Sequence, residues 1–353
     1  MMSKLSFQYF DDRFQYGELL DANQKIVKSI GDKQSRFIYE NRLLFSLTDN
    51  PEYMKKILLE VPVGKELYNR LNQYGSLLIY GAGKRGKRLV DMFPDLKWKK
   101  FFDQKERGDY KGIVVDNADN MFYFNDSAVV VSIYSGFDDV KKTLIENGWP
   151  DEDIIVLGEY DKQMSEDMYF EREIVPDSIP APFFVDGGAY DCKDTLKFRD
   201  YYKLDVNFGA IAIEPDKESY ARCKEKMKEF PNVDIVNAVL SDGSVDEIGF
   251  MDGKGEGSSV CLDALQKAKV ITIDALKRDV SFIKLDVEGN ELETLKGAKE
   301  TIKSQKPILA ISVYHRRSDI WTIPNYILSI NPEYKIYFRH YTVSYGDTVL
   351  YAI

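Results

Sequence analysis

The segment FFVDGGAYDCKDT, residues 183–195, decides the fold of the second half of this chain. Its apolar start predicts a strand that ends at Asp186, and the polar residues after Gly187 and Gly188 predict a helix. A strand that breaks into a glycine turn before a helix is how α/β folds approach a nucleotide-like ligand. Glycine allows this approach because it has no Cβ. We therefore expect a parallel α/β sheet with a ligand at this turn.

Three further predicted strands in this half end in an acid, at Glu214, Asp242 and Asp286. The carboxyl ends of parallel strands share one edge of an open sheet, and ligands bind at that edge. An acid after the second strand suits the two ribose hydroxyls of an adenosine. We therefore predict Glu214 on a ribose and Asp242 near an adenine.

The glycine turn lacks the pattern of a dinucleotide site. A full G-x-G-x-x-G seats a pyrophosphate on a helix N-terminus, whereas Gly187 and Gly188 are followed by AYDC without the later glycine. Acids crowd the turn, which favours a ligand without phosphate and with a positive centre. S-adenosylmethionine, with its ribose, adenine, amino acid tail and sulfonium, is such a ligand.

Three segments together resemble the FkbM-type methyltransferases. They are DGGA at 186–189, EP at 214–215, and IKLDVEGNELETLKGA at 283–298, which is the most specific. The resemblance spans residues 183–353 and implies an S-adenosylmethionine-dependent methyltransferase. It also implies a class I, Rossmann-like methyltransferase domain whose closing strand is antiparallel. Cys192 stands where the family usually has glycine, which puts the local turn geometry in doubt.

The predicted cofactor contacts follow from the glycine turn, the resemblance and the acids at the strand ends. They are Asp186, Gly187, Gly188, Ala189, Tyr190, Thr195, Glu214, Pro215, Ser241, Asp242 and Asp286.

The chain has two histidines, His315 and His340, and each is predicted at the carboxyl end of a strand in this sheet. Methyl transfer from a sulfonium is an in-line displacement, and a hydroxyl acceptor needs a base that removes its proton. Histidine suits that task near neutral pH. We predict His315 as the base and Asp286 as its partner, with His340 and Glu288 as further candidates. In the alternative, Asp286, His315 and His340 hold a divalent metal; we favour the metal-free base.

The acids after Asp286 also have a structural interpretation. Asn290 can cap the helix that follows, and Glu291 and Glu293 lie in its first turn, where the helix dipole favours negative charge. We therefore expect Glu291 and Glu293 to stabilise the helix.

Residues 76–158 predict a smaller Rossmann-like α/β domain. A strand over 76–80 runs into GAGKRG at 81–86, and a second strand ends at Asp103. Binding of NAD or a nucleotide sugar would use Gly81, Gly83, Gly86 and Asp103, and Lys84 and Arg85 would face a phosphate. The unit has no evident catalytic base, and a purely structural role is an equal alternative.

The expected organisation has four parts: helices over 1–75, the smaller domain over 76–158, a linker over 159–182 and the methyltransferase-like domain over 183–353. The linker includes the prolines of its second half, which disfavour regular structure. The N-terminal helices pack on their own chain or on a second copy, so a homo-oligomer is one interpretation.

Composition narrows the partners. A formal net charge of −10 argues against nucleic acid as the main partner, because phosphate binding needs clustered Lys and Arg. The apolar runs are of strand length and the first residues lack a signal-peptide core, so we expect no membrane span and a cytoplasmic location. The leading functional hypothesis is O-methylation of a sugar hydroxyl of a glycan or related metabolite. The alternatives are an NAD-dependent sugar-nucleotide oxidoreductase or epimerase, and a non-catalytic nucleotide-binding scaffold.

Overall fold

The computed structural model describes residues 16–251, 259–260 and 267–353. The chain divides into two compact units. Unit 1 holds the described residues up to Tyr39 together with Asp167–Arg339 and Asp347–Ile353, and unit 2 holds Glu40–Glu166 and His340–Gly346. This division differs from the expected one, because the first helices are shared between the units and part of the expected linker belongs to unit 1.

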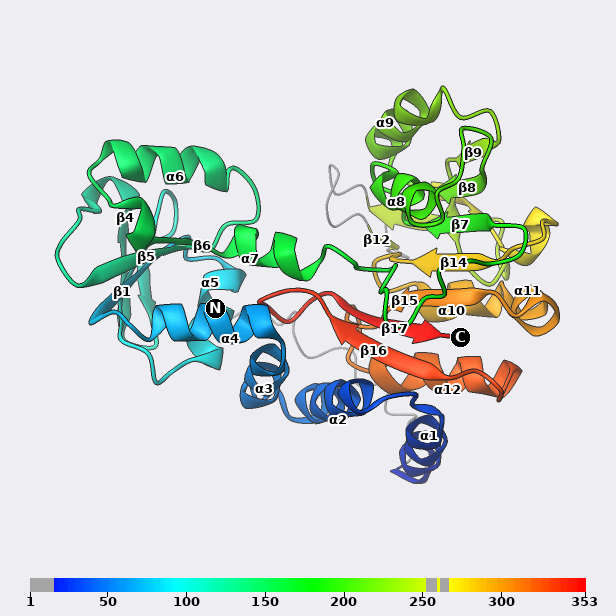
Figure 1. Ribbon diagram of the computed structural model, residues 1–353, viewed down its shortest axis with the longest axis horizontal. Helices are drawn as coiled ribbons and strands as arrows, with labels where there is room; N and C mark the ends of the chain where they lie inside the picture. The colour runs from blue at the N-terminus through cyan, green and yellow to red at the C-terminus, as the bar shows by residue number, and fades with distance from the viewer. Residues whose placement is uncertain (1–15, 252–258, 261–266) are drawn as a thin grey trace. The chain divides into compact units, whose positions relative to one another are not determined.

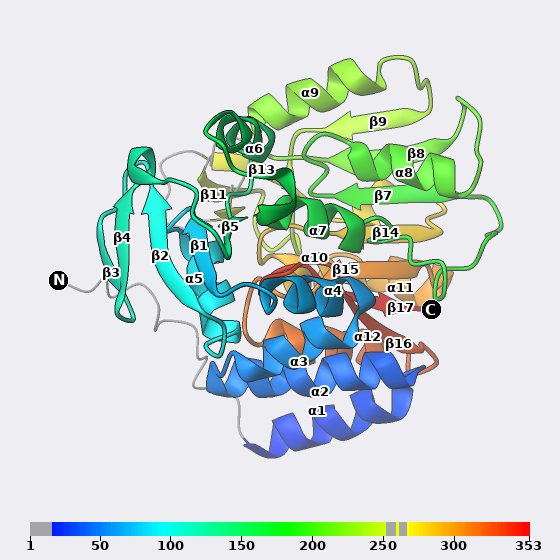
Figure 2. The ribbon, with the colours of Figure 1, turned by 60° about the vertical axis from the view of Figure 1, so that its left-hand side comes forward.

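Unit 1 is built on a seven-stranded sheet of order β16-β17-β15-β14-β7-β8-β9, whose strands lie side by side in Figure 2. The strands are β7 (Phe183–Gly187), β8 (Gly209–Ile213), β9 (Val233–Val236), β14 (Phe282–Leu285), β15 (Ile308–Ser312), β16 (Ile336–His340) and β17 (Thr348–Ala352). The five strands from β9 to β15 are parallel, and β17 is antiparallel to β15. The predicted parallel sheet with an antiparallel closing strand is confirmed.

The helices of unit 1 cover this sheet. They are α1 (Tyr16–Ser29), α8 (Lys193–Tyr201), α9 (Lys217–Met227), α10 (Glu291–Lys296), α11 (Lys299–Gln305) and α12 (Asp319–Ile330). Helix α1 packs beside α12 within the same unit (Figure 1). A smaller sheet of order β10-β13-β11-β12 comprises Val239–Leu240, Lys267–Ile271, Glu247–Met251 and Ser259–Val260.

The core of unit 1 lies under the glycine turn and is rich in aromatic rings. Phe184 of β7 stacks on Phe198 of α8 with ring centroids 4.6 Å apart, and Phe282 of β14 lies 5.6 Å from Phe184. All three side chains are fully buried. Rings of this size dominate the apolar area that a core removes from water, so they hold β7, β14 and α8 together.

Cys192, the residue that departs from the family's glycine, has a left-handed backbone with φ 57°. Glycine adopts that conformation without a Cβ penalty, so a glycine would suit the position. The cysteine remains there as part of a buried cluster with Ala189 and Cys223.

Unit 2 is a second α/β unit with the strand order β3-β4-β2-β1-β5-β6. Its strands are β1 (Ser76–Tyr80), β2 (Trp98–Asp103), β3 (Gly108–Tyr110), β4 (Ile113–Asn117), β5 (Ser127–Val131) and β6 (Ile154–Val156). Its helices are α3 (Glu52–Glu60), α4 (Pro62–Leu71), α5 (Lys84–Met92), α6 (Phe137–Glu146) and α7 (Leu157–Met164), and α2 (Lys33–Thr48) is shared with unit 1. The strand, glycine turn and helix expected over 76–92 are confirmed.

Part of the expected linker is ordered as core of unit 1. Tyr169 and Phe170 are buried, and the Phe170 ring lies 5.3 Å from that of Phe282.

Across the described residues, the structure holds no helix with the length and apolar character needed to cross a membrane.

Candidate active site

The glycine turn after β7 is held against the ends of two neighbouring strands. Gly188 has φ +74°, and a Cβ added there would lie 1.8 Å from the backbone oxygen of Asp286. Its N–H donates to the carbonyl of Ile213, the last residue of β8, over 3.0 Å. No side chain fits at Gly188, so the sequence requires glycine where β7, β8 and β14 end together.

A buried lysine holds this glycine turn in place through a hydrogen bond to its backbone. The sequence alone did not point to this lysine. Lys284 of β14 donates to the Gly188 carbonyl over 2.8 Å and to Asp186 over 3.1 Å. The second Asp186 oxygen accepts the Thr195 hydroxyl at 2.6 Å, so these two predicted cofactor residues bind one another. Burial alone would lower the pKa of Lys284, but Asp186 and Asp194 raise it above the usual value. The lysine therefore stays charged and ties two strands to α8.

Glu214, the predicted ribose ligand, is held in place by backbone donors. One carboxylate oxygen accepts the N–H of Tyr190 and the other that of Asp216, each over 2.8 Å. Each carboxylate oxygen has a second lone-pair direction, so Glu214 retains capacity for hydroxyl donors. The Tyr190 side chain is 42% exposed beside it.

The other predicted cofactor residues lie at the ends of neighbouring elements. Ser241 is buried after β10, and the exposed Asp242 accepts the N–H of Ser244, which lowers the pKa of this carboxyl group. Pro215 follows Glu214, and its carbonyl accepts the amide of Asn237. Ala189 is buried, and its N–H is bound to the end of β8.

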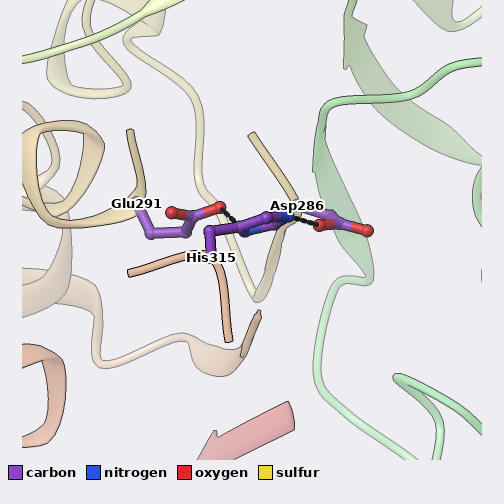
Figure 3. Close-up of side chains that lie close together, drawn as sticks. All are labelled: Asp286, Glu291 and His315. Atoms are coloured by element: carbon purple, nitrogen blue, oxygen red, sulfur yellow. Dashed lines mark ion pairs between the residues drawn. The ribbon is translucent and has the colours of Figure 1, made fainter. Parts of the chain in front are cut away.

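Several carboxylate side chains surround His315, which follows β15. Its ring nitrogen Nδ1 lies 2.9 Å from Glu291 Oε1, and Nε2 lies 3.4 Å from Asp286 Oδ1 and 3.5 Å from Glu288 Oε2. Figure 3 shows the imidazole between Asp286 and Glu291, with one ring nitrogen toward each. Both ring nitrogens are buried and make these close charge contacts without an aligned hydrogen bond among the described residues. The predicted pairing of His315 with Asp286 is present.

Two tyrosines hold Asp286 on the other side. The Tyr169 hydroxyl donates to Oδ2 over 2.8 Å, and the Tyr314 hydroxyl donates to Oδ1 over 3.4 Å. Burial alone would raise the pKa of Asp286, but the charges of His315 and Lys284 and the Tyr169 hydroxyl bring it below its usual value. Asp286 is therefore a fixed anion.

The carboxylates around His315 change its charge state. Burial alone would lower its pKa, but Glu291 first, and then Asp286 and Glu288, raise the pKa from 6.5 to about 9. Asp319 at the start of α12 adds a fourth carboxyl group, whose pKa is raised to about 7 by burial and by Glu291. At neutral pH the imidazole is therefore a cation among acids.

The side chains around His315 include a donor set that could hold a metal ion. Asp286, Glu291 and His315 present ligand atoms within 4.8 Å of one another. However, the two carboxylates contact different nitrogens of the ring, so an ion bound at one nitrogen would have one of them across the ring. His340, the third ligand in the expected metal site, belongs to unit 2, where its Nε2 faces the carbonyl of Ser344 at 3.2 Å. Burial lowers the pKa of His340 to about 3.

In unit 2, nearby residues pack against two glycines of the motif and bind the acid that follows it. Gly81 and Gly86 pack against Ser132, and Gly83 faces open space. Asp103 accepts the N–H of Ala82 over 2.9 Å, as well as two N–H groups of its own turn. The carboxylate expected to bind a ribose therefore already has three donors.

The expectation that Arg85 faces a phosphate is wrong. Its side chain is buried, pairs with Asp161 and donates to the carbonyl of Ile133 over 2.9 Å. Arg85 lies in the first turn of α5, and a side chain in that turn can point toward the sheet instead of toward a ligand at the helix end. In this structure it points inward and is buried. Lys84 is exposed.

Besides Lys284, the sequence did not reveal the roles of Glu291 and Tyr169. Glu291 was explained as a helix-end acid, yet its side chain is only 1% exposed and touches His315. Asn290 makes no side-chain cap for α10, because its amide donates to the carbonyl of Leu240. Tyr169 fell in the expected linker. An apolar pair within that charged segment, Tyr169-Phe170, was the signal that could have revealed it.

Comparison with known proteins agrees with this description. The family model described as "Methyltransferase FkbM domain" matches residues 186–335. A search of curated proteins gave no significant match. Among solved structures, the methyltransferase FkbM from Methylobacillus flagellatus KT is 19% identical, with a TM-score of 0.48 over 95% of this chain and 100% of that chain.

Two other solved structures are more distant. The precorrin-6y C5,15-methyltransferase from Geobacter metallireducens GS-15 is 13% identical, with a TM-score of 0.33 over 56% of this chain and 88% of that chain. Fibrillarin from Aeropyrum pernix, solved with bound S-adenosyl-L-methionine, is 9% identical, with a TM-score of 0.31 over 51% of this chain and 70% of that chain.

The sheet order with its antiparallel closing strand, and the glycine turn at its edge, define a class I methyltransferase fold. Within that class, residues 186–335 match the FkbM methyltransferase domain model, and the chain is an S-adenosylmethionine-dependent methyltransferase.

Proposed function

We propose that this enzyme methylates a hydroxyl group, that of a sugar in a glycan or a related metabolite, with His315 as the general base. One observation carries the proposal: His315 lies in a cluster of acids that includes Asp286, and the backbone of Asp286 forms one side of the glycine turn. The base and the expected cofactor turn thus meet at a single residue.

S-adenosylmethionine, when bound, supplies an electrophilic methyl group and a positive sulfonium. In this proposal Glu214 receives the ribose hydroxyls through its remaining acceptor capacity, and Asp242, which follows β10, lies near the adenine. Asp286 stays ionised, so it would offer a negative charge to a sulfonium bound at this turn.

His315 removes the proton of the acceptor hydroxyl as the new O–CH₃ bond forms and the S–CH₃ bond breaks. The products are the methyl ether, S-adenosylhomocysteine and a protonated imidazole. Because the pKa of His315 is raised to about 9, most molecules hold this residue protonated at pH 7. Only the neutral imidazole can accept a proton, so the rate should rise with pH until about 9.

The test uses labelled S-adenosylmethionine and a panel of free and nucleotide-linked sugars. His315→Gln should lower turnover by roughly 10²–10⁴-fold, the usual contribution of one acid–base group. Its affinity for S-adenosylhomocysteine, measured by calorimetry, should stay close to that of the wild type. Full turnover in the variant, or a wild-type rate that does not rise between pH 6.5 and about 9, would refute the assigned base.

NAD chemistry in unit 2 is not favoured. Asp103 is already bound by three backbone N–H groups, and Arg85 is paired with Asp161. Asp103 therefore has less spare acceptor capacity than Glu214, and Arg85 would have to leave Asp161 to receive a phosphate.

A further inference from the structure

We infer that Glu291 is the positioning residue of the reaction: it fixes the Nδ1 side of His315 and so leaves Nε2 as the nitrogen that meets the acceptor. The inference rests on the proposed function, because it assigns how the proposed base is oriented. It gives a role in the reaction to a side chain whose sequence position indicated only helix stabilisation.

Backbone hydrogen bonds hold the Glu291 carboxylate in place independently of its contact with the imidazole. Its Oε1 accepts the N–H of Val287 over 2.9 Å and that of Gly289 over 3.3 Å, and the same oxygen lies 2.9 Å from His315 Nδ1. The side chain is 1% exposed. Two backbone donors fix the oxygen within the loop after β14, so the ring is held relative to the backbone that follows Asp286.

The two sides of the imidazole differ in access. On the Nδ1 side, Glu291 is almost completely buried. On the Nε2 side, the side chains of Asp286 and Glu288 are 26% and 47% exposed and lie 3.4 and 3.5 Å from the nitrogen. The Nε2 side is therefore the more open side of the ring, although Nε2 itself is buried behind these two carboxylates. A carboxylate on the far nitrogen is the arrangement that selects the tautomer of a catalytic histidine and stabilises its charged form.

Several charged groups from neighbouring elements surround His315 and act on its titration. The segment from β14 to α10 supplies Asp286, Glu288 and Glu291, and α12 supplies Asp319. Lys284 acts on Asp286 from β14, and Arg316 follows His315 in the chain and interacts with Asp319. After burial, Glu291 has the largest influence on the pKa of His315. Its removal should therefore lower that pKa more than the loss of any other single neighbour.

Nitrogen-15 NMR of the imidazoles tests this without an acceptor. The chain has two histidines, and burial lowers the pKa of His340 to about 3, so His315 is the one that titrates between pH 5 and 10. In the wild-type protein above about pH 10, where the His315 ring is neutral, the ring should carry its proton on Nδ1, facing Glu291. In Glu291→Gln the midpoint should fall by at least about one pH unit.

Glu293→Gln is the matched control, since it removes a carboxylate from the same helix turn that is 30% exposed and paired with Lys296. Its His315 midpoint should match the wild type. An unchanged midpoint in Glu291→Gln overturns the inference. If that variant does not fold, the wild-type tautomer decides alone: a neutral ring protonated on Nε2 overturns the inference equally.

Activity measurements distinguish the positioning role of Glu291 from the proposed function of His315 as the base. Glu291→Gln should lower kcat on the order of 10²–10⁴-fold with little change in KM, and should shift the pH–rate rise to lower pH. Glu291→Asp, which keeps the charge, should recover part of the loss. If His315→Gln keeps full turnover, the proposed function fails even where the NMR result upholds the Glu291 contact. If His315→Gln is inactive but Glu291→Gln is fully active, only the positioning role fails.

Discussion

At the scale of single residues, the site depends on a few backbone positions that admit one residue type. Gly188 is the clearest, because its φ is +74° and the backbone oxygen of Asp286 occupies the space of a Cβ. The motif is therefore a packing requirement of the three strand ends as well as an approach route for the cofactor. Any side chain at Gly188 must push β14 away from β7.

Gly188→Ala should abolish measurable binding of S-adenosylhomocysteine and lower the melting temperature. The added Cβ would lie 1.8 Å from a backbone atom, so no flexible side chain can relieve the contact. Gly83→Ala is the control, because a Cβ there meets nothing within 4 Å. Calorimetric titration of both variants checks this; retained affinity in Gly188→Ala would show that the turn can move apart without loss of the site.

Local residue patterns predicted β7 and its turn well and the contacts across the chain poorly. The third strand, expected to end at Asp242, ends in the large sheet at Val236, and Val239–Leu240 belongs to the smaller sheet. The apolar run before Asp186 and the glycine pair are local signals, and they placed β7 and its turn correctly. Tyr169 could not be placed, because its hydrogen bond to Asp286 joins residues 117 positions apart. Glu291 was missed for another reason: a helix-end acid already has a sufficient local explanation, which hides a second role.

At the scale of elements, Lys284 is the joint between β14, β7 and α8. It is 2% exposed and contacts Asp186 of β7 over 3.1 Å and Asp194 of α8 over 3.6 Å. Burying a charge is costly unless partners compensate it, so the lysine and its two acids depend on one another. The glycine turn rests on this group through the Gly188 carbonyl.

Lys284→Met should therefore destabilise unit 1 by about 3–5 kcal/mol, since it leaves buried acids without a partner. Lys296→Met is the control; that lysine is 42% exposed and its pair with Glu293 should contribute about 1 kcal/mol or less. The measurement is urea unfolding followed by the fluorescence of Trp321, in a chain with Trp98 and Trp149 replaced by phenylalanine. Equal stability of the two variants would contradict the assigned role of Lys284.

At the scale of the whole molecule, two α/β units carry glycine turns but differ in what those turns hold. In unit 1 the turn borders the His315 cluster and leaves Glu214 with spare acceptor capacity. In unit 2 the corresponding acid, Asp103, binds three N–H groups of its own turns. One ligand site for an adenosine is therefore expected from two similar motifs.

Calorimetry should find one S-adenosylhomocysteine bound per chain and no heat of binding with NAD. Gly83→Val should leave that stoichiometry and affinity as in the wild type, while Gly188→Ala removes the binding. A second S-adenosylhomocysteine site, or NAD binding that Gly83→Val eliminates, would show that the fingerprint of unit 2 is in use.

The interleaved division of the chain has a consequence for its synthesis. Unit 2 needs His340–Gly346, and the sheet of unit 1 needs β17, which inserts between β15 and β16 although it follows both in the chain. At about 5–20 residues per second, the loop segment leaves the ribosome on the order of ten seconds after Glu166. Unit 2 is therefore incomplete until Gly346 has been added, and the sheet of unit 1 until β17 has. The nascent chain therefore spends that interval incomplete in both halves, and chaperones have two open cores to protect at once.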